Sequence, residues 1–198
     1  MKKIIISLLL IFISSVSFAN DRFYIGLEVS NNEYDTGVSA VSGATLDDED
    51  TGYAIVGGFM LADNIDLEFG YRDFGEASLK GDSGDTFTLD GTDYVFTASA
   101  TIKAEADSFF LGVKPSHTLT DNVQVFGRLG IHNWDSTVSV SSATASADVN
   151  EDGTDPYYGV GLSAKFSNGF VAEASYNSYQ TDDDITSLSG FIGYRFEY

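Results

Sequence analysis

Asp148, Asn150 and Asp152, followed by Gly153, form the most specific chemical motif of the chain. They reproduce the first half of an EF-hand loop, in which carboxylate and amide oxygens converge on Ca²⁺ and glycine permits a sharp turn. The twelfth position of such a loop is Gly159 instead of the bidentate glutamate. Asn-Glu-Asp-Gly is also a good turn sequence by itself. These three residues are candidate calcium ligands, and apart from divalent cations at the acidic loops we expect no metal and no cofactor.

Residues suited to nucleophilic or acid–base catalysis are sparse. The chain has no cysteine, which excludes a disulfide scaffold, a thiolate metal site and a catalytic thiol. Its two histidines, His117 and His132, have no serine and acid placed to suggest a triad. Glu68 and Glu173 could form a carboxylate pair for acid–base catalysis. However, both are expected to face the interior of a plugged barrel, as argued below, where a substrate would not reach them. We therefore expect that the protein is not an enzyme.

Acidic residues dominate the charge of the chain. Its 198 residues include 30 Asp and Glu against 10 Lys and Arg, a formal net charge of −20, which argues against nucleic-acid binding. Segments 31–50, 73–107, 135–155 and 178–184 contain 22 of these acids and only two bases, Lys80 and Lys103. The sequence therefore predicts one strongly negative surface, on which divalent cations are the only expected small ligands.

The first nineteen residues have the pattern of a secretory signal peptide. Lys2 and Lys3 precede an apolar run over 4–13, and Ser17-Phe18-Ala19 provides the small residues of a cleavage site. The run is too short for the ~20 residues of a membrane-spanning helix. We expect residues 1–19 to be cleaved and residues 20–198 to form one domain with a formal charge of −22.

Eight segments of the mature chain alternate apolar residues with polar or small ones. Each covers about ten positions, the length that a tilted strand needs to cross a bilayer. In the first segment, for example, Ile25, Leu27 and Val29 share one face opposite Tyr24 and Glu28. The segments lie at about 23–29, 52–61, 65–72, 108–114, 123–132, 158–166, 170–177 and 192–198.

The polar face of these segments carries nearly all the remaining basic residues and an equal number of acids. A lysine or arginine that faces lipid at mid-membrane costs ~2–4 kcal/mol, so this face must line the lumen of a barrel. Charges buried there need partners of opposite sign. The predicted lumenal charge network is Glu28, Asp66, Glu68, Arg72, Lys114, Arg128, Lys165, Glu173, Arg195 and Glu197.

The connections alternate between short polar turns, such as 62–64 and 167–169, and long acidic segments. Short turns on one side and long loops on the other are typical of bacterial outer-membrane barrels. Within the long segments, 86–97 resembles a hairpin around Asp90-Gly91, and 137–149 alternates as a strand extension would. The fold prediction is all-β: an eight-stranded antiparallel up-and-down transmembrane β-barrel with short periplasmic turns and long extracellular loops. A lipocalin-like cup, the soluble alternative, needs an apolar interior that the charged face cannot provide.

Several stretches are similar to a known family. They are 52–53, 67–75 (Leu-Glu-Phe-Gly-Tyr-Arg-Asp-Phe-Gly), 155–162 and the ending 193–198 (Gly-Tyr-Arg-Phe-Glu-Tyr). The mature chain resembles the small eight-stranded outer-membrane β-barrels, which include OmpA-like transmembrane domains and porin-family proteins. The resemblance implies a monomer in the bacterial outer membrane, surrounded by lipid and lipopolysaccharide. The aromatic residues at 194, 196 and 198 of this chain resemble the C-terminal signal that the outer-membrane assembly machinery reads.

Function follows less directly than the fold. An eight-stranded barrel is about wide enough to be filled by its own side chains, so we expect the paired charges to plug the lumen. The expected role is then structural or interactive, through acidic extracellular loops whose partner the sequence does not identify. The alternative is a narrow ion-conducting pore, in which Glu68 or Glu173 exchanges partners between Arg128 and Arg195. A lipid A-modifying enzyme is the less favoured alternative.

Overall fold

The computed structural model describes residues 23–181 and 183–196. The expected signal peptide, Glu197 and Tyr198 lie outside the described residues. Within the described ranges there is no helix of the length and apolarity required to span a membrane.

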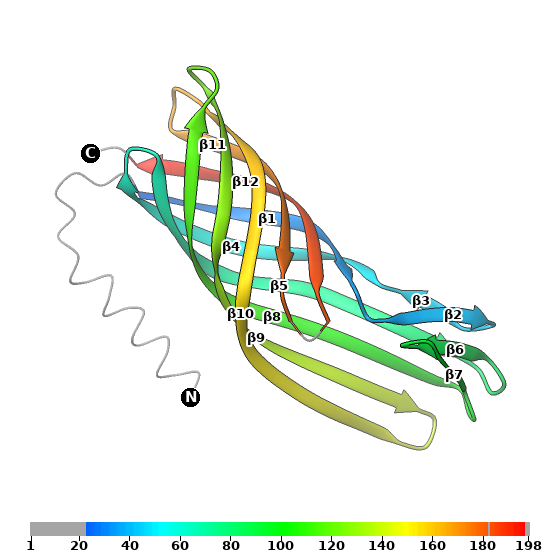
Figure 1. Cartoon of the computed structure of the whole chain (residues 1–198). Coiled ribbons are helices and arrows are strands. Elements are labelled where there is room, and N and C mark those ends of the chain that lie inside the picture. Colours follow the sequence, from blue (N-terminus) through cyan, green and yellow to red (C-terminus); the bar gives the residue numbers. More distant parts are fainter. Residues whose placement is uncertain (1–22, 182, 197–198) are drawn as a thin grey trace.

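Eight long strands form a closed antiparallel ring (Figure 1). Each strand pairs with the next one in the ring, and β1 closes it by pairing with β12 from Phe23↔Phe196 to Tyr34↔Ile185. This arrangement confirms the predicted fold class. The strands are β1 (Phe23–Tyr34), β4 (Glu49–Ala62), β5 (Ile65–Gly81), β8 (Ala100–Thr118), β9 (Val123–Ser142), β10 (Ser146–Lys165), β11 (Phe170–Tyr179) and β12 (Ile185–Phe196).

The alternation of the sequence becomes the two faces of the barrel wall, because successive side chains of a strand point to opposite sides of the sheet. On β1, Tyr24 and Glu28 are each 1% exposed, whereas Leu27 between them is 59% exposed. The same alternation continues around the ring, with Glu68 buried on β5 and Leu129 exposed on β9 beside buried Arg128. The charged face is the lumen and the aliphatic face is the outer surface, as predicted.

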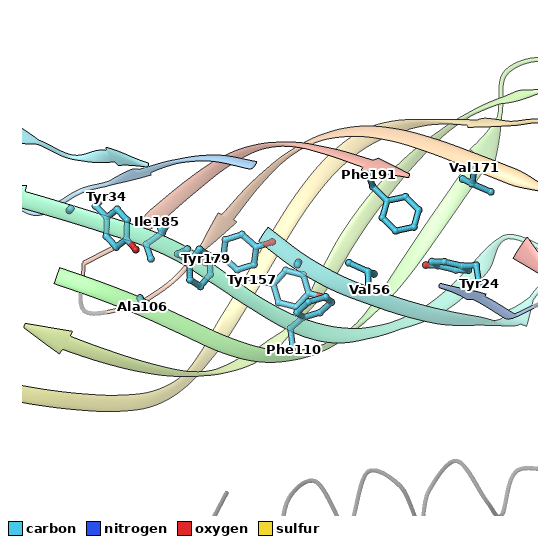
Figure 2. Packing of buried hydrophobic residues seen from close by; sticks show 13 residues of the cluster. Tyr24, Tyr34, Val56, Ala106, Phe110, Tyr157, Val171, Tyr179, Ile185 and Phe191 are labelled. Atoms are coloured by element: carbon cyan, nitrogen blue, oxygen red, sulfur yellow. The ribbon is translucent and has the colours of Figure 1, made fainter. Parts of the chain in front are cut away.

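Large aromatic side chains also point into the lumen, which the alternation did not reveal. Figure 2 shows Phe110, Tyr157 and Tyr179 projecting into the interior from three strands. Tyr157 and Tyr179 stack with ring centroids 5.4 Å apart, and Phe110 meets Tyr157 edge-on at 5.7 Å. These residues escape a simple apolar-out, polar-in pattern because they are apolar residues at inward positions. The barrel interior is thus partly aromatic and partly ionic.

The long segments are mostly continued strands instead of irregular loops. The expected loop at 73–107 contains the end of β5 and the start of β8, and 135–155 lies in β9 and β10 apart from their short connection. Their alternating residues sustain the pairing beyond the membrane, as expected for 137–149. A bulge between Asp73 and Glu76, with Gly75 at φ 80°, marks where β5 leaves the barrel wall.

We call residues 35–50, 73–107 and 135–155 the outer extension. It includes the short strands β2 (Val38–Ser42), β3 (Thr45–Asp47), β6 (Thr86–Leu89) and β7 (Thr92–Val95). The predicted 86–97 hairpin is confirmed as β6 and β7, joined through Asp90 and Gly91 with φ values of 49° and 78°. The extension projects well past the hairpin of β11 and β12, so the barrel has one tall side and one short side (Figure 1).

Candidate functional site

Arg128 is the centre of the lumenal charge network. It points inward from β9 and is 5% exposed. Its guanidinium donates from Nε to Glu68 at 2.9 Å, from Nη1 to Glu28 at 3.0 Å and from Nη2 to Glu173 at 3.1 Å. Nη1 also donates to the Ser175 hydroxyl at 3.1 Å. The acceptors come from β1, β5 and β11, so a single side chain joins walls on different sides of the lumen.

Lys114 of β8 lies next to this centre, toward the end of the barrel that has the short turns. Its Nζ donates to Glu68 Oε1, Glu173 Oε1 and the Tyr24 hydroxyl, each at 2.9 Å. The Tyr24 hydroxyl in turn donates to Glu68 Oε1 at 2.5 Å. Each of the two glutamates therefore binds Lys114 through one oxygen and Arg128 through the other. This sharing gives both oxygens of each carboxylate a cationic partner, as buried charges require.

Two further pairs lie above and below the centre. Arg72 Nη2 donates to Glu28 Oε1 at 2.5 Å, and its guanidinium carbon lies 4.9 Å from the centroid of the Tyr179 ring. Arg195 Nη2 donates to Asp66 Oδ2 at 3.0 Å, near the short turns. The aromatic ring beside Arg72 supplies a cation–π contact that partly replaces lost hydration.

The structure brings eight of the ten candidate residues into buried ion pairs: Glu28, Asp66, Glu68, Arg72, Lys114, Arg128, Glu173 and Arg195. Lys165 is half-buried and is the last residue of β10, and Glu197 lies outside the described residues. Sequence reasoning missed Tyr24 and Ser175 as members of the network. Both share the lumenal face with a charged residue of the same strand, and that spacing was the available signal.

The candidate calcium motif does not form a loop. Asp148, Asn150 and Asp152 lie in the straight part of β10 and pair with Ser139, Thr137 and Asp135 of β9. Alternate residues of a strand lie ~6.6 Å apart, so the three side chains do not converge as in an EF-hand. Asn150 Oδ1 instead accepts a hydrogen bond from Thr137 Oγ1 at 2.9 Å. The EF-hand interpretation is therefore corrected, because the residues continue a ribbon where a turn was considered.

The two histidines occupy different surroundings. His132 is fully buried above the ionic centre, where its Nε2 lies 2.8 Å from the Gln180 carbonyl and its ring meets Tyr179 edge-on at 5.5 Å. His117 is exposed and belongs to the last residues of β8, where a turn was expected. Among the described residues, no group of three or more histidine or acidic side chains is arranged to hold a metal ion.

Comparison with known proteins agrees with this architecture. The model of the family described as OmpA-like transmembrane domain matches residues 18–197. No curated protein sequence matches the chain.

Three solved structures illustrate the likeness. Ail, the attachment invasion locus protein of Yersinia pestis, solved with the heparin analogue sucrose octasulfate, has 18% identity and a TM-score of 0.53 over 89% of this chain and 98% of Ail. The outer membrane protein OprG from Pseudomonas aeruginosa has 16% identity and a TM-score of 0.54, and the match covers 91% of this chain and 97% of OprG. The N-terminal β-barrel domain of OprF from the same species has 14% identity and a TM-score of 0.50, and the match covers 87% of this chain and 97% of the OprF domain.

At these identities the structural likeness establishes the fold, and the family match covers nearly the whole chain. The protein is a bacterial outer-membrane β-barrel, and a structural or cell-surface role is consistent with that class. The chain belongs to the OmpA-like transmembrane domain family.

Proposed function

We propose that this protein is a barrel with a closed lumen that anchors an acidic β-sheet at the cell surface for interaction with an external partner. One observation carries the proposal: Arg128 binds Glu28, Glu68 and Glu173 at once, across the barrel interior. A residue that joins three strands in this way holds the lumen shut and the walls together. The barrel then serves as a rigid support for the outer extension.

Ion conduction is the competing function. A path through the lumen requires Arg128 to leave its carboxylates, and Lys114 holds Glu68 and Glu173 in the same place. Separating a buried charge from its partners costs about 3–5 kcal/mol. The aromatic layer of Tyr157 and Tyr179 lies farther along the same interior. Both layers favour closure.

The outer extension favours a cationic partner. Its segments carry most of the acids of the chain, with Lys80 and Lys103 as their only bases. Ail was solved with sucrose octasulfate, an anionic ligand. The negative charge of this extension would repel such a ligand, so we do not propose that this protein binds polysulfated sugars. Contact with anionic lipopolysaccharide would likewise need divalent cations as bridges, whereas a basic protein surface would bind directly.

The remaining parts of the proposal concern the membrane itself. The aliphatic and aromatic side chains of the outer surface contact lipid, and aromatic residues at strand ends, such as the stacked pair Phe23 of β1 and Phe196 of β12, set the depth of the barrel. The protein acts as a monomer and has no enzymatic activity, including on lipid A. Mass analysis of lipid A from an overexpressing strain checks the last statement, because an enzyme would produce a modified species.

Single-cysteine labelling tests the display of the extension, since the natural chain has no cysteine. Ser141→Cys places a thiol on exposed β9 near the tip of the extension, and Asp121→Cys places one in the exposed turn between β8 and β9. With a membrane-impermeant maleimide on intact cells, we expect Ser141→Cys to react and Asp121→Cys to react only after permeabilisation. The reverse pattern would place the extension in the periplasm and reject the proposal.

A further inference from the structure

Strand β10 has one open side in the outer extension. From Tyr157 to Lys165 it lies between β9 and β11, but from Ser146 to Asp155 it pairs with β9 alone. The cause is the short hairpin of β11 and β12, since β11 ends at Tyr179, opposite Tyr157. Ten residues of an edge strand therefore remain beyond the closed barrel, and Figure 1 shows the ribbon of β9 and β10 standing apart from β11 and β12.

The backbone groups on this side can be assigned from one hydrogen bond. The Pro156 carbonyl accepts from the Gln180 N–H at 3.1 Å, so it points away from β9. In an antiparallel strand, alternate residues turn both backbone groups to the same side. The residues that share the parity of Pro156 are Ser146, Asp148, Asn150, Asp152 and Thr154. Their N–H and C=O groups form what we call the open edge, and no backbone partner for them exists within 23–181 and 183–196.

A row of aspartates leads to the same edge. Asp73 of β5 is in register with Asp107 of β8, Asp107 with Asp135 of β9, and Asp135 with Asp152 of β10. Their strand neighbours Arg72, Ser108 and Trp134 are buried, so the first three side chains lie on the outward face. Asp152 is exposed and pairs with Asp135, so its side chain lies on the same face. We call these four residues the aspartate row. Cross-strand neighbours have Cβ atoms ~5 Å apart, where like charges repel and an added positive charge is favoured.

Exposed strand edges are usually protected against pairing, and charge is one form of protection. Here Asp148 and Asp152 of the open edge, with nearby Glu151 and Asp155, exclude a second copy of this chain. Two copies side by side in one membrane would bring these acids against each other. A strand that carries lysine or arginine would instead be attracted. Its basic side chain would lie beside Asp152, at the end of the aspartate row, and would supply the row with a counter-charge.

We propose that the open edge of β10 binds an extended, lysine- or arginine-rich peptide segment as an added strand. Backbone hydrogen bonds to the open edge hold the segment, and the acids beside them select its charge. The partner of this protein is then a basic, extended segment of an external protein. This inference deepens the proposed function and rests on the display of the extension at the surface.

Binding of synthetic peptides to the detergent-refolded mature protein provides the test, by calorimetry or fluorescence anisotropy in about 0.1 M salt, where the screening length is ~10 Å. The probe is a peptide of about nine residues, an ordinary strand length, with alternating lysine and threonine or valine. The control has the same sequence with alternate backbone amides N-methylated, which keeps the charge and removes hydrogen bonds along one edge. We expect saturable binding of the probe, at least about tenfold tighter than the control.

Matched variants locate the site. Asn150→Pro removes one N–H from the open edge without touching the pairing with β9, since proline is tolerated where an edge N–H faces solvent. Asn150→Ala loses the same side-chain contact with Thr137 and keeps the N–H. We expect Asn150→Pro, and not Asn150→Ala, to weaken binding by about five- to tenfold. Asp152→Asn should also weaken it, whereas Asp121→Asn in the turn between β8 and β9 should not.

Three results would overturn the inference: no binding of the basic probe, equal binding of the N-methylated control, or equal binding to Asn150→Pro and Asn150→Ala. The second result would mean electrostatic attraction without strand addition. The measurement uses purified protein, so it does not depend on which way the barrel faces in the cell. A failure here with normal cysteine labelling rejects the peptide site and leaves the proposed function intact.

Discussion

The lumen and the outer extension of this barrel use the same charged residue types in opposite ways. In the lumen, four acids and four bases form buried ion pairs, and Arg128 alone contacts three glutamates. In the extension, four aspartates stand in register across neighbouring strands. Lys103 of the extension forms an ion pair with Glu76 at 2.8 Å, and both side chains are partly exposed.

The difference follows from solvation. A buried charge without a partner costs several kcal/mol, so the ion pairs described in the lumen use acids and bases in equal number. Water and salt screen exposed charges, so neighbouring aspartates cost little and can be kept for binding. Under the proposed function, pairing in the lumen serves closure and stability, whereas the like charge of the extension serves the binding of a partner.

Removing Arg128 should have the largest effect. Arg128→Met leaves Glu28, Glu68 and Glu173 with only Arg72 and Lys114 as buried counter-charges, which is one positive charge too few. We therefore expect the free energy of unfolding to fall by about 3–5 kcal/mol. Urea titration with the heat-dependent gel shift as readout measures it. Lys103→Met on the extension is the matched control and should leave the midpoint unchanged. Equal effects of the two variants would contradict the distinction between lumen and extension.

Removing Lys114 should have a smaller effect in the same direction. Lys114→Met deprives Glu68 and Glu173 of one cation, but both keep Arg128, so a loss of about 2–3 kcal/mol is expected. The double variant with Arg128→Met should not be additive, because the two bases share the same carboxylates. Additivity within error would show that the two sites are independent and that no common network exists.

Salt should affect the two regions differently. Raising salt from about 0.1 to 1 M shortens the screening length from ~10 to ~3 Å. We expect slower amide hydrogen exchange in the parts of β9 and β10 beyond Trp134 and Gly153, because screening relieves the aspartate row. Amides around Arg128 should not change, because water and ions do not surround the lumenal pairs. A uniform response of both regions would contradict this expectation.

The smallest effect is expected for a single aspartate of the row. Asp152→Asn removes one like-charge contact with Asp135 and should stabilise the ribbon of β9 and β10 locally, by about 0.2–1 kcal/mol. Hydrogen exchange of the ribbon amides at low salt measures the change. Asp90→Asn, in the hairpin turn and outside the row, is the control. Faster exchange in Asp152→Asn would mean that Asp152 is held by a favourable contact.

Sequence alone was sufficient for the wall of the barrel, because lipid enforces a strict alternation. Leu27 and Glu28 were placed on opposite faces for that reason, and the structure agrees. The aromatic filling was missed because residues such as Phe110 are apolar at inward positions and break the pattern. The hairpin at 86–97 was visible because its turn residues are local in sequence.

The sequence alone could not predict which acid pairs with which base in the lumen, nor that four aspartates lie in one row. Both depend on cross-strand register over segments far apart in the chain, such as Asp107 opposite Asp135. Register is determined by the shear of the whole ring, which no single hairpin reveals. The same limit explains the calcium motif: Asp148, Asn150 and Asp152 resemble a loop until their pairing with β9 is known.

Planar-bilayer conductance of the detergent-refolded mature chain tests the central claim most directly, after the heat-dependent gel shift has confirmed folding. The account predicts no unitary steps from the natural protein, because Arg128 and Lys114 hold the carboxylates of the lumen together. Reproducible unitary steps from well-folded protein, altered by Arg128→Met or Glu173→Gln, would contradict closure and assign the lumenal charges to ion transport.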